Sequence, residues 1–231
     1  LAGGVTELLA MPNTFPVCDS VQVAKEIQQK AQGTGVTVYS SAAVTKGQKG
    51  EELCDFKAFA DAGILAVTDD GHPVRDAQIL EQALTEAKKT GLLVISHCED
   101  LEMVAGGIMH EGAVSGALSV KGISRRSEDL STERDILLAE KVGTRLHIAH
   151  VSTKGAVEAI RGAKRRGAQI TAETCPHYLL LEHSLLLGRD ADYRMNPPLR
   201  EKEDIAAVIE GLLDGTIDVI STDHAPHTPE E

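Results

Sequence analysis

The chain has 231 residues, of which 42% are hydrophobic and 25% are charged, which is enough for one folded domain with a sizeable core. The charged residues, 23 Lys and Arg against 35 Asp and Glu, give a net charge of -12 without a basic stripe, so nucleic acid and anionic membranes are not expected partners. No apolar run approaches the roughly 18 residues that cross a bilayer, and the 4 cysteines form no short CxxC pair, so we expect a cytoplasmic protein with reduced thiols.

Short apolar runs rich in β-branched residues alternate with amphipathic helical patterns along the chain. The apolar runs are nearly continuous, which is typical of strands covered on both faces in a parallel sheet. Strands are predicted at 5–10, 36–40, 65–68, 92–96, 145–149, 169–172 and 218–221. Helices are predicted between them at 20–32, 76–89, 131–142, 155–166 and 201–213, several of them ending at a glycine.

This series of strand–helix units lacks both the glycine fingerprint of a dinucleotide-binding fold and a phosphate-binding P-loop. The pattern therefore favours a TIM-like (β/α)8 barrel over a doubly wound sheet. An eighth strand is expected to precede Leu1, so residues 1–231 are interpreted as one barrel catalytic domain that is incomplete at both ends. The stretch 103–127, rich in Gly and polar residues, is predicted to be an insertion near the active face.

Polar side chains abruptly follow several of the predicted strands, where barrel enzymes place their chemistry. They are Asn13, Asp69, Asp70, His97, His150 and Asp223. Imidazole and carboxylate groups together suit Zn²⁺ or a similar divalent ion. Taken singly, each histidine is more often a hydrogen-bonded structural residue, and Asp69 and Asp70 are common turn formers. Their coincidence at separate strand ends favours a metal site.

The other histidines receive structural interpretations. His147 lies three residues before His150 in the same strand, so we expect the two to face opposite sides, with His147 packed outward or beneath a helix. His72, His110 and His183 are expected on the surface or in loops. His177 is expected to be structural, with a supporting position around the site as the alternative.

A resemblance to a known family is carried by AMPNT (10–14), TDDGHPV (68–74), HCED (97–100), HIAHVST (147–153), MNPPLR (195–200) and TDHAPH (222–227). In this order and spacing the chain resembles the dihydroorotase family of the amidohydrolase superfamily, with its bacterial monofunctional branch as the best match. The resemblance covers essentially the whole chain. HIAHVS and DHAPH alone would also fit allantoinases and hydantoinases.

The resemblance implies a role for each matching residue. Asp70 resembles the carboxylate that bridges two metals, and His97 and His150 resemble the ligands of one of them. Asp223 resembles a ligand of the other metal that also acts as general base. The residues that match substrate-holding positions, mainly for an α-carboxylate, are Asn13, Asn196 and His227. The implied cofactor is zinc, as one or two divalent ions. The implied reaction is reversible cyclisation of N-carbamoyl-L-aspartate to L-dihydroorotate in pyrimidine biosynthesis.

Departures from the family pattern are as informative as the matches. Hydantoinases, allantoinases and animal-type dihydroorotases use a carboxylated lysine where this strand ends in Asp69 and Asp70, which favours the aspartate-bridged bacterial type. The family's first strand carries an HxH pair and a neighbouring Arg, and neither is found in this sequence. A glycine-containing substrate segment expected after TDHAPH is also missing. Within this chain the second metal would therefore have only Asp70 and Asp223 as ligands.

Two alternatives stay open at this point. One is an allantoinase-type or hydantoinase-type amidohydrolase. The other is a catalytically silent, dihydroorotase-like scaffold, for example a partner of aspartate carbamoyltransferase, although such a scaffold is expected to have lost its metal ligands. The expected partner is a small-molecule substrate, and either a homodimer or association with aspartate carbamoyltransferase is compatible with the resemblance.

Overall fold

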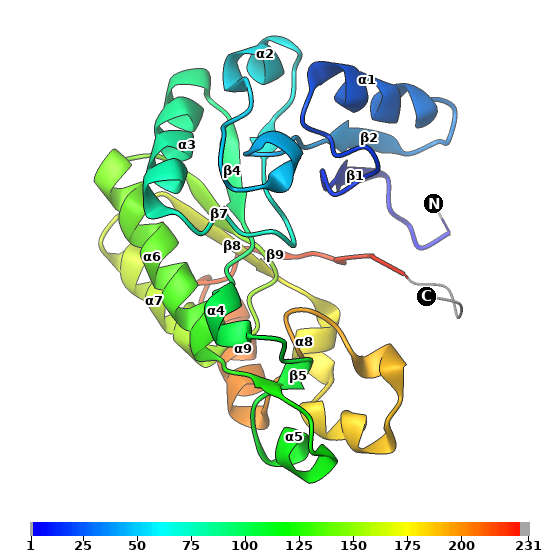
Figure 1. Cartoon of the computed structure of the whole chain (residues 1–231), viewed down its shortest axis with the longest axis vertical. Helices are drawn as coiled ribbons and strands as arrows, with labels where there is room; N and C mark the ends of the chain where they lie inside the picture. The colour runs from blue at the N-terminus through cyan, green and yellow to red at the C-terminus, as the bar shows by residue number, and fades with distance from the viewer. Residues whose placement is uncertain (1, 227–231) are drawn as a thin grey trace.

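The computed structural model describes residues 2–226 and shows parallel strands that follow one another in chain order, with helices along their outer side (Figure 1). The strands are β1 (Glu7–Ala10), β2 (Thr37–Ser40), β3 (Ala66–Val67), β4 (Leu93–Ser96), β7 (Leu146–Ile148), β8 (Ile170–Thr174) and β9 (Val219–Ile220). A parallel bridge between Ala42 and Val67 joins the β1–β2 pair to the β3–β4–β7–β8–β9 sheet. Chain-order pairing of this kind defines a partial (β/α) barrel, because a doubly wound sheet reverses its strand order. The predicted fold class and all the predicted strands are confirmed.

Capping side chains and a glycine mark the ends of several of the helices that cover the sheet. They are α1 (Val21–Lys30), α2 (Phe56–Asp61), α3 (Ala77–Thr90), α6 (Arg126–Val142), α7 (Lys154–Arg165) and α9 (Lys202–Leu213). The Asp76 carboxylate caps α3 by accepting from the backbone N–H groups of Gln78 and Ile79, and Gly91 ends this helix in the left-handed conformation at φ 77°. The hydroxyl of Thr153 caps α7 in the same way. The observed ends of the predicted helices lie within one or two residues of the predicted ends. The exception is α6, which begins earlier than predicted.

Two apolar clusters lie on opposite faces of the sheet. The larger cluster fills the space between the strands and the outer helices and includes Leu84, Val94, Leu146 and Ile160, all essentially without exposure. The smaller cluster contains Ala66, Ile95 and Ala149 and lies on the inner face of the sheet. Strands buried on both faces explain why the apolar runs of the sequence are continuous rather than alternating.

Two segments extend beyond the strand–helix repeat, in the lower part of Figure 1. The first contains α4 (Leu101–Val104), β5 (Met109–His110), α5 (Ala113–Leu118) and β6 (Gly122–Ile123), and β5 pairs with β6 in parallel. The second contains α8 (Pro176–Leu180) and the 3-10 helices η2 (His183–Gly188) and η3 (Ala191–Tyr193). A further 3-10 turn, η1 (Lys46–Gln48), follows β2. The predicted insertion at 103–127 therefore has short regular elements of its own, and α6 already begins at Arg126.

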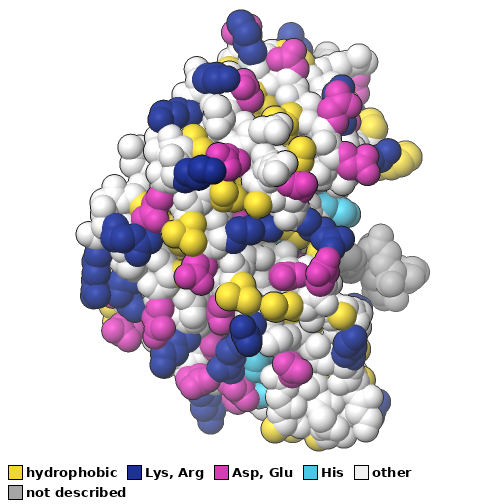
Figure 2. Space-filling model, turned by 60° about the vertical axis from the view of Figure 1, so that its left-hand side comes forward, with side chains coloured by type: hydrophobic (Ala, Val, Ile, Leu, Met, Phe, Trp, Pro, Cys, Tyr) yellow, Lys and Arg dark blue, Asp and Glu magenta, His cyan; other side chains and the backbone are white. Residues whose placement is uncertain are grey.

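The outer face of the helices carries Lys and Arg side chains interspersed with Asp and Glu, and apolar side chains between them (Figure 2). Ion pairs between neighbouring helices account for part of this mixture, as between Lys141 and Glu81 and between Arg166 and Glu140. Over residues 2–226, no helix combines the length and the apolar character needed to cross a membrane.

Candidate metal centre

Three predicted ligands converge at the carboxyl ends of β3, β4 and β7. His97 Nδ1 lies 2.8 Å from His150 Nε2. Asp70 Oδ1 lies 3.8 Å from His97 Nδ1 and 3.5 Å from His150 Nε2. The two imidazoles are 4% and 5% exposed, and both point toward the Asp70 carboxylate. Parallel pairing brings these residues together, because the ends of parallel strands meet at the same edge of the sheet.

The backbone turns sharply at His150 to direct its ring into this site. Regular alternation ends with β7 at Ile148, and His150 has a left-handed φ of 35°. The prediction that His147 packs outward or beneath a helix is wrong. His147 is paired in register with Ile95 and shares the inner face with it, where its imidazole contacts Thr171 Oγ1 at 2.8 Å and Glu173 Oε2 at 3.3 Å. The left-handed residue breaks the alternation on which the prediction relied.

The carboxylates near His150 stabilise the protonated form of its imidazole. Burial disfavours the charged form of His150, but the hydrogen bond to Asp70, followed by the charges of Asp70 and Asp223, outweighs burial and raises the pKa of His150 to about 9. Burial alone would raise the pKa of Asp70, and the hydrogen bond and charge of His150 reverse this and lower it. A divalent ion would replace the proton between these groups, since metal ligation and protonation compete for the same lone pair.

The geometry of the donor set fits such an ion. Two ligands on a tetrahedral zinc at ~2.0–2.1 Å lie about 3.3 Å apart, and the three separations here lie within roughly half an ångström of that value. His150 Nδ1 is buried and has no hydrogen-bond partner among the described residues, so its ring is held from the Nε2 side alone. Asp70, His97 and His150 can therefore hold one divalent cation with little movement.

A second layer of polar groups orients these ligands. Glu99 Oε2 lies 3.3 Å from His97 Nε2, the ring nitrogen opposite the one that faces Asp70. The amide of Asn196 donates to the same Glu99 oxygen at 3.2 Å, and the amide of Asn13 donates to Asp70 Oδ2 at 3.5 Å. Burial opposes ionisation of Glu99, but the contacts with His97 and then Asn196 lower its pKa. A carboxylate on the far nitrogen of a ligating imidazole is a common supporting contact in metal sites.

Glu99 is a residue beside the candidate ligands that the sequence interpretation missed. The signal was present in the HCED segment, since residues two apart in an extended chain lie on the same side. Asp69, by contrast, is structural. Its buried carboxylate accepts from the backbone N–H groups of Val44 at 2.8 Å and Thr45 at 3.2 Å. Asp69 therefore fixes the end of β3 against the neighbouring segment, while Asp70 faces the site.

Asp223 follows β9 and has a left-handed φ of 45°. Its carboxylate lies within 4.8 Å of Cys175 Sγ and a His177 nitrogen, and the set formed by Asp70, His97 and His150 does not include it. His177 has a lowered pKa, caused first by burial. The negative charge of Asp223 nevertheless reaches His150, because it helps to raise the pKa of that imidazole. His227, the remaining predicted substrate-holding residue, lies outside the described residues.

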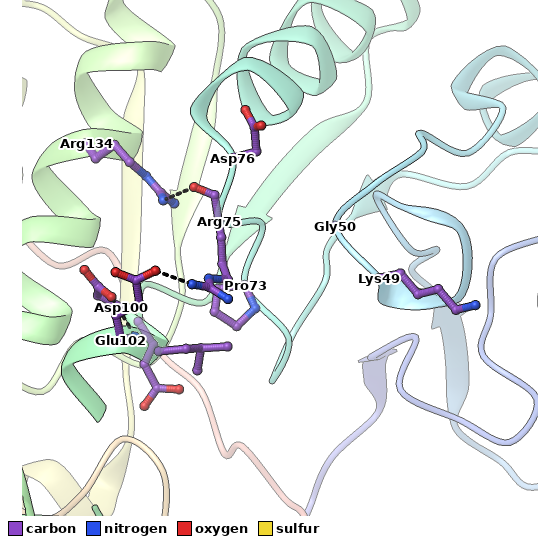
Figure 3. A pocket seen from close by; sticks show the side chains of 10 residues that line it. Lys49, Gly50, Pro73, Arg75, Asp76, Asp100, Glu102 and Arg134 are labelled. Atoms are coloured by element: carbon purple, nitrogen blue, oxygen red, sulfur yellow. Dashed lines mark hydrogen bonds and ion pairs between the residues drawn. The ribbon is translucent and has the colours of Figure 1, made fainter. Parts of the chain in front are cut away.

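A cavity of about 490 Å³ adjoins this centre through Glu99. Figure 3 shows it between Lys49 and Gly50 on one side and Pro73, Arg75, Asp100 and Glu102 on the other. Arg134 closes one wall and donates to the backbone oxygens of Val74 and Arg75, at 3.0 Å in each case. The loops that follow β2, β3 and β4 therefore form a polar cavity on the side of the sheet where the ligands lie.

A partial (β/α) barrel with His and Asp side chains clustered at its strand ends is the arrangement that metal-dependent barrel hydrolases use. The model of the family described as "Dihydro-orotase-like" matches residues 1–156. The dihydroorotase of Pelotomaculum thermopropionicum is 52% identical over 99% of this chain and 54% of its own length. That of Syntrophotalea carbinolica is 49% identical over 100% of this chain and 54% of its own length. The chain therefore belongs to the dihydro-orotase-like family, and it spans about half the length of the curated relatives it matches.

Solved structures give the same fold. The dihydropyrimidinase from Brevibacillus agri is 25% identical with a TM-score of 0.77, covering 98% of this chain and 52% of that chain. The L-hydantoinase from Arthrobacter aurescens is 23% identical with a TM-score of 0.81, covering 99% of this chain and 52% of that chain. The second likeness concerns the fold alone. Both likenesses extend over nearly the whole of this chain, including the parallel strands described above.

Proposed function

We propose that this chain carries part of the active centre of a dihydroorotase, which interconverts N-carbamoyl-L-aspartate and L-dihydroorotate. The observation that carries the proposal is the convergence of Asp70, His97 and His150 within hydrogen-bond or near-ligand distance. The identity of 52% to a dihydroorotase over 99% of the chain supports the same reaction. Zinc is the proposed metal, because two imidazoles and a carboxylate suit it.

Asp70, His97 and His150 would hold the metal, which would supply polarisation of the amide carbonyl and a lowered pKa of water, so that hydroxide is available near neutral pH. The chain's own residues then have distinct tasks. Glu99 holds the far nitrogen of His97 and so fixes the direction of its ring. Asp223 is proposed as a ligand of a second metal and as the general base that moves the proton from the attacking water to the leaving amide nitrogen. Asn13, Asn196 and His227 are proposed to hold the substrate carboxylate and so orient the ring.

The hydantoinase-type alternative is compatible with the likeness to a dihydropyrimidinase structure at 25% identity, but that likeness does not favour it. The residue that argues against it is Asp70, since the resemblance places a carboxylated lysine there in hydantoinases and allantoinases. An assay of the full-length enzyme with dihydroorotate, a hydantoin and allantoin separates the alternatives. We expect turnover of dihydroorotate alone, and preferential turnover of either other ring would overturn the proposal.

The proposed base can be tested in the full-length enzyme. Asp223→Asn keeps the size of the side chain, and asparagine tolerates the left-handed backbone found at this position. The amide, however, cannot act as a base. We expect a loss of at least ~100-fold in kcat. Turnover close to that of the unchanged enzyme would remove Asp223 from the mechanism.

The silent-scaffold alternative predicts no stoichiometric metal, so metal analysis of the purified full-length protein decides between it and the enzyme. Beyond the reaction itself, we propose a role in pyrimidine biosynthesis in the cytoplasm. A homodimer, or association with aspartate carbamoyltransferase, remains the proposed partnership. That residues 1–231 form one catalytic domain also remains a prediction.

A further inference from the structure

The loop that follows β2 reaches across to the turn that carries Asp70. Gln48, the last residue of η1 in this loop, donates from its side-chain Nε2 to the backbone oxygen of Asp70 at 3.3 Å. The two residues are 22 positions apart in the sequence, and Gln48 is only 7% exposed. Gln48 therefore contacts the main chain of a candidate metal ligand from the end of a different strand.

Asp70 lies in a tight turn whose central peptide can take two orientations. The turn closes with the N–H of His72 donating to the backbone oxygen of Asp69 at 2.8 Å. Gly71, its third residue, has a φ of 75°, whereas Asp70, its second, is not in the left-handed region. This is the pattern of a type II turn, which differs from a type I turn by a flip of the peptide between the second and third residues. A partner for the backbone oxygen of Asp70 therefore selects one of the two orientations.

The same peptide carries an N–H group that interacts with the Asp70 side chain. Burial alone would raise the pKa of the Asp70 carboxyl, and the contacts with His150 and His97 lower it. The backbone N–H of Gly71 adds to this lowering, because it donates to the carboxylate. Gln48 holds the oxygen of this peptide, so a flip that breaks the Gln48 contact would also turn the Gly71 N–H away from the carboxylate. The orientation of the carboxylate is therefore tied to Gln48.

The backbone of Gln48 is held in a costly conformation. Its φ is 54°, in the left-handed region that glutamine seldom enters. Such conformations persist where the surrounding structure fixes them, and they gather at functional sites. Here the N–H of Gln48 donates to the backbone oxygen of Thr45 at 3.0 Å, and the N–H of Gly47 donates to Asp19 Oδ2 at 2.9 Å. The loop thus keeps Gln48 in the conformation from which its amide reaches Asp70.

Asp69 ties the same two loops together in the opposite direction. Its carboxylate accepts from the backbone N–H of Val44 and from the backbone N–H and hydroxyl of Thr45. These bonds hold the loop after β2 against the end of β3. Asp69 therefore joins the two loops, while Gln48 acts on the peptide that follows Asp70.

We propose that Gln48 is a positioning residue for Asp70: its amide fixes the Asp70–Gly71 peptide, and this peptide directs the Asp70 carboxylate toward the two imidazoles. The inference rests on the proposed function, since it takes Asp70 as a metal ligand. A carboxylate that is already held in place loses less freedom when an ion binds. Contacts that orient metal ligands are typically worth about 10–100-fold in metal affinity.

The test compares the zinc affinity of folded, full-length protein, measured by competition with a chromophoric chelator. Gln48→Met keeps the length of the side chain and removes the donor. We expect zinc to bind about 10–100-fold more weakly to this variant. Gln82→Met makes the same substitution at an exposed position of α3, and it should leave the affinity within about twofold of that of the unchanged protein.

A second pair of variants tests the orientation of the peptide without changing Gln48. Nothing lies within 4 Å of a Cβ added at Gly71, so a side chain at this position meets no clash. Gly71→Ala disfavours the left-handed conformation and with it the type II turn, whereas Gly71→Asn tolerates both. We expect Gly71→Ala to weaken zinc binding about as much as Gln48→Met does, and Gly71→Asn to retain most of the affinity.

The outcomes separate the positioning role from the proposed function. Absence of stoichiometric zinc from the unchanged protein overturns both. Zinc binding by the unchanged protein with equal affinity in Gln48→Met overturns the positioning role alone, even where the urea midpoint of the metal-free variant falls, because a role in folding alone leaves the affinity of the folded protein unchanged. If Gln48→Met does not fold, equal affinities of the two Gly71 variants overturn the positioning role.

Discussion

Glu128 provides the polar anchor for the segment that follows His150, and its replacement should be costly. The carboxylate lies on α6 and is 4% exposed. It accepts from the backbone N–H groups of Ser152 at 2.8 Å and Thr153 at 3.0 Å, and from both of their hydroxyls. Arg200 donates to it at 3.2 Å and is itself only 2% exposed. Glu128→Gln keeps the shape, removes the charge and turns an NH2 group toward these donors.

The magnitude follows from the loss of a buried ion pair. Removing one partner of such a pair costs about 3–5 kcal/mol, because the other charge stays buried without compensation. The contacts left to Arg200 are neutral ones, with Ser152 Oγ, His110 Nδ1 and the backbone oxygen of Ile123. With a urea m-value of roughly 2–3 kcal/mol/M for a chain of this size, the unfolding midpoint should fall by roughly 1.5 M.

The measurement is urea denaturation of the metal-free chain in the presence of a chelator, since bound metal would add its own stabilisation. Glu158→Gln is the matched control. Glu158 is an exposed residue of α7 whose contact with Lys154 is at 4.0 Å, so its loss should cost less than ~0.5 kcal/mol. Equal midpoints for the two variants would refute the argument that the Glu128–Arg200 pair anchors this segment.

Three further outcomes follow from particular contacts. Gly155→Ala should destabilise the chain by about 1–3 kcal/mol, because the added Cβ overlaps the Asp129 carboxylate. Gly162→Ala in the same helix is the control and should be neutral or stabilising, and thermal unfolding of the two variants measures the difference. Burial raises the pKa of Cys54 to about 12, so at pH 8 only about 10⁻⁴ of it is thiolate, and mass spectrometry should find it unmodified by iodoacetamide until the chain unfolds. Because the pKa of His150 is raised to about 9, protons compete with metal below that pH, and zinc affinity at the candidate centre should rise about tenfold per pH unit up to pH 9; a flat profile in a chelator titration would contradict this.

The sequence predicted the barrel strands and the position of the candidate metal ligands for one physical reason. A strand buried on both faces is apolar throughout, so the first polar residue after it marks its carboxyl end. His97 and His150 were found in this way, and the structure places them 2.8 Å apart. Whether Asp223 and Asn196 act as proposed stays a prediction, although Asn196 does lie beside the centre through Glu99.

What the sequence did not predict depends on contacts between distant segments. The first turn of α6 contains buried polar residues such as Ser127 and Glu128, so the apolar periodicity began too late to indicate its start. The burial of His110 and His183 arises where β5, η2 and the start of α9 meet, and no local pattern reports such a meeting. The prediction that His110 and His183 lie on the surface or in loops is wrong as to exposure, because histidine suits both an exposed loop and a charged interior.

The left-handed backbone at His150 and Asp223 has a consequence for how these positions can change. With φ values of 35° and 45°, both lie in a region that Asn, Asp and His enter several times more often than other residues with side chains. Exchange for a β-branched residue would therefore distort the main chain as well as delete the functional group, and the two effects could not be told apart. Asparagine at either position would keep the bend and isolate the chemistry, which makes it the better choice for dissecting this centre.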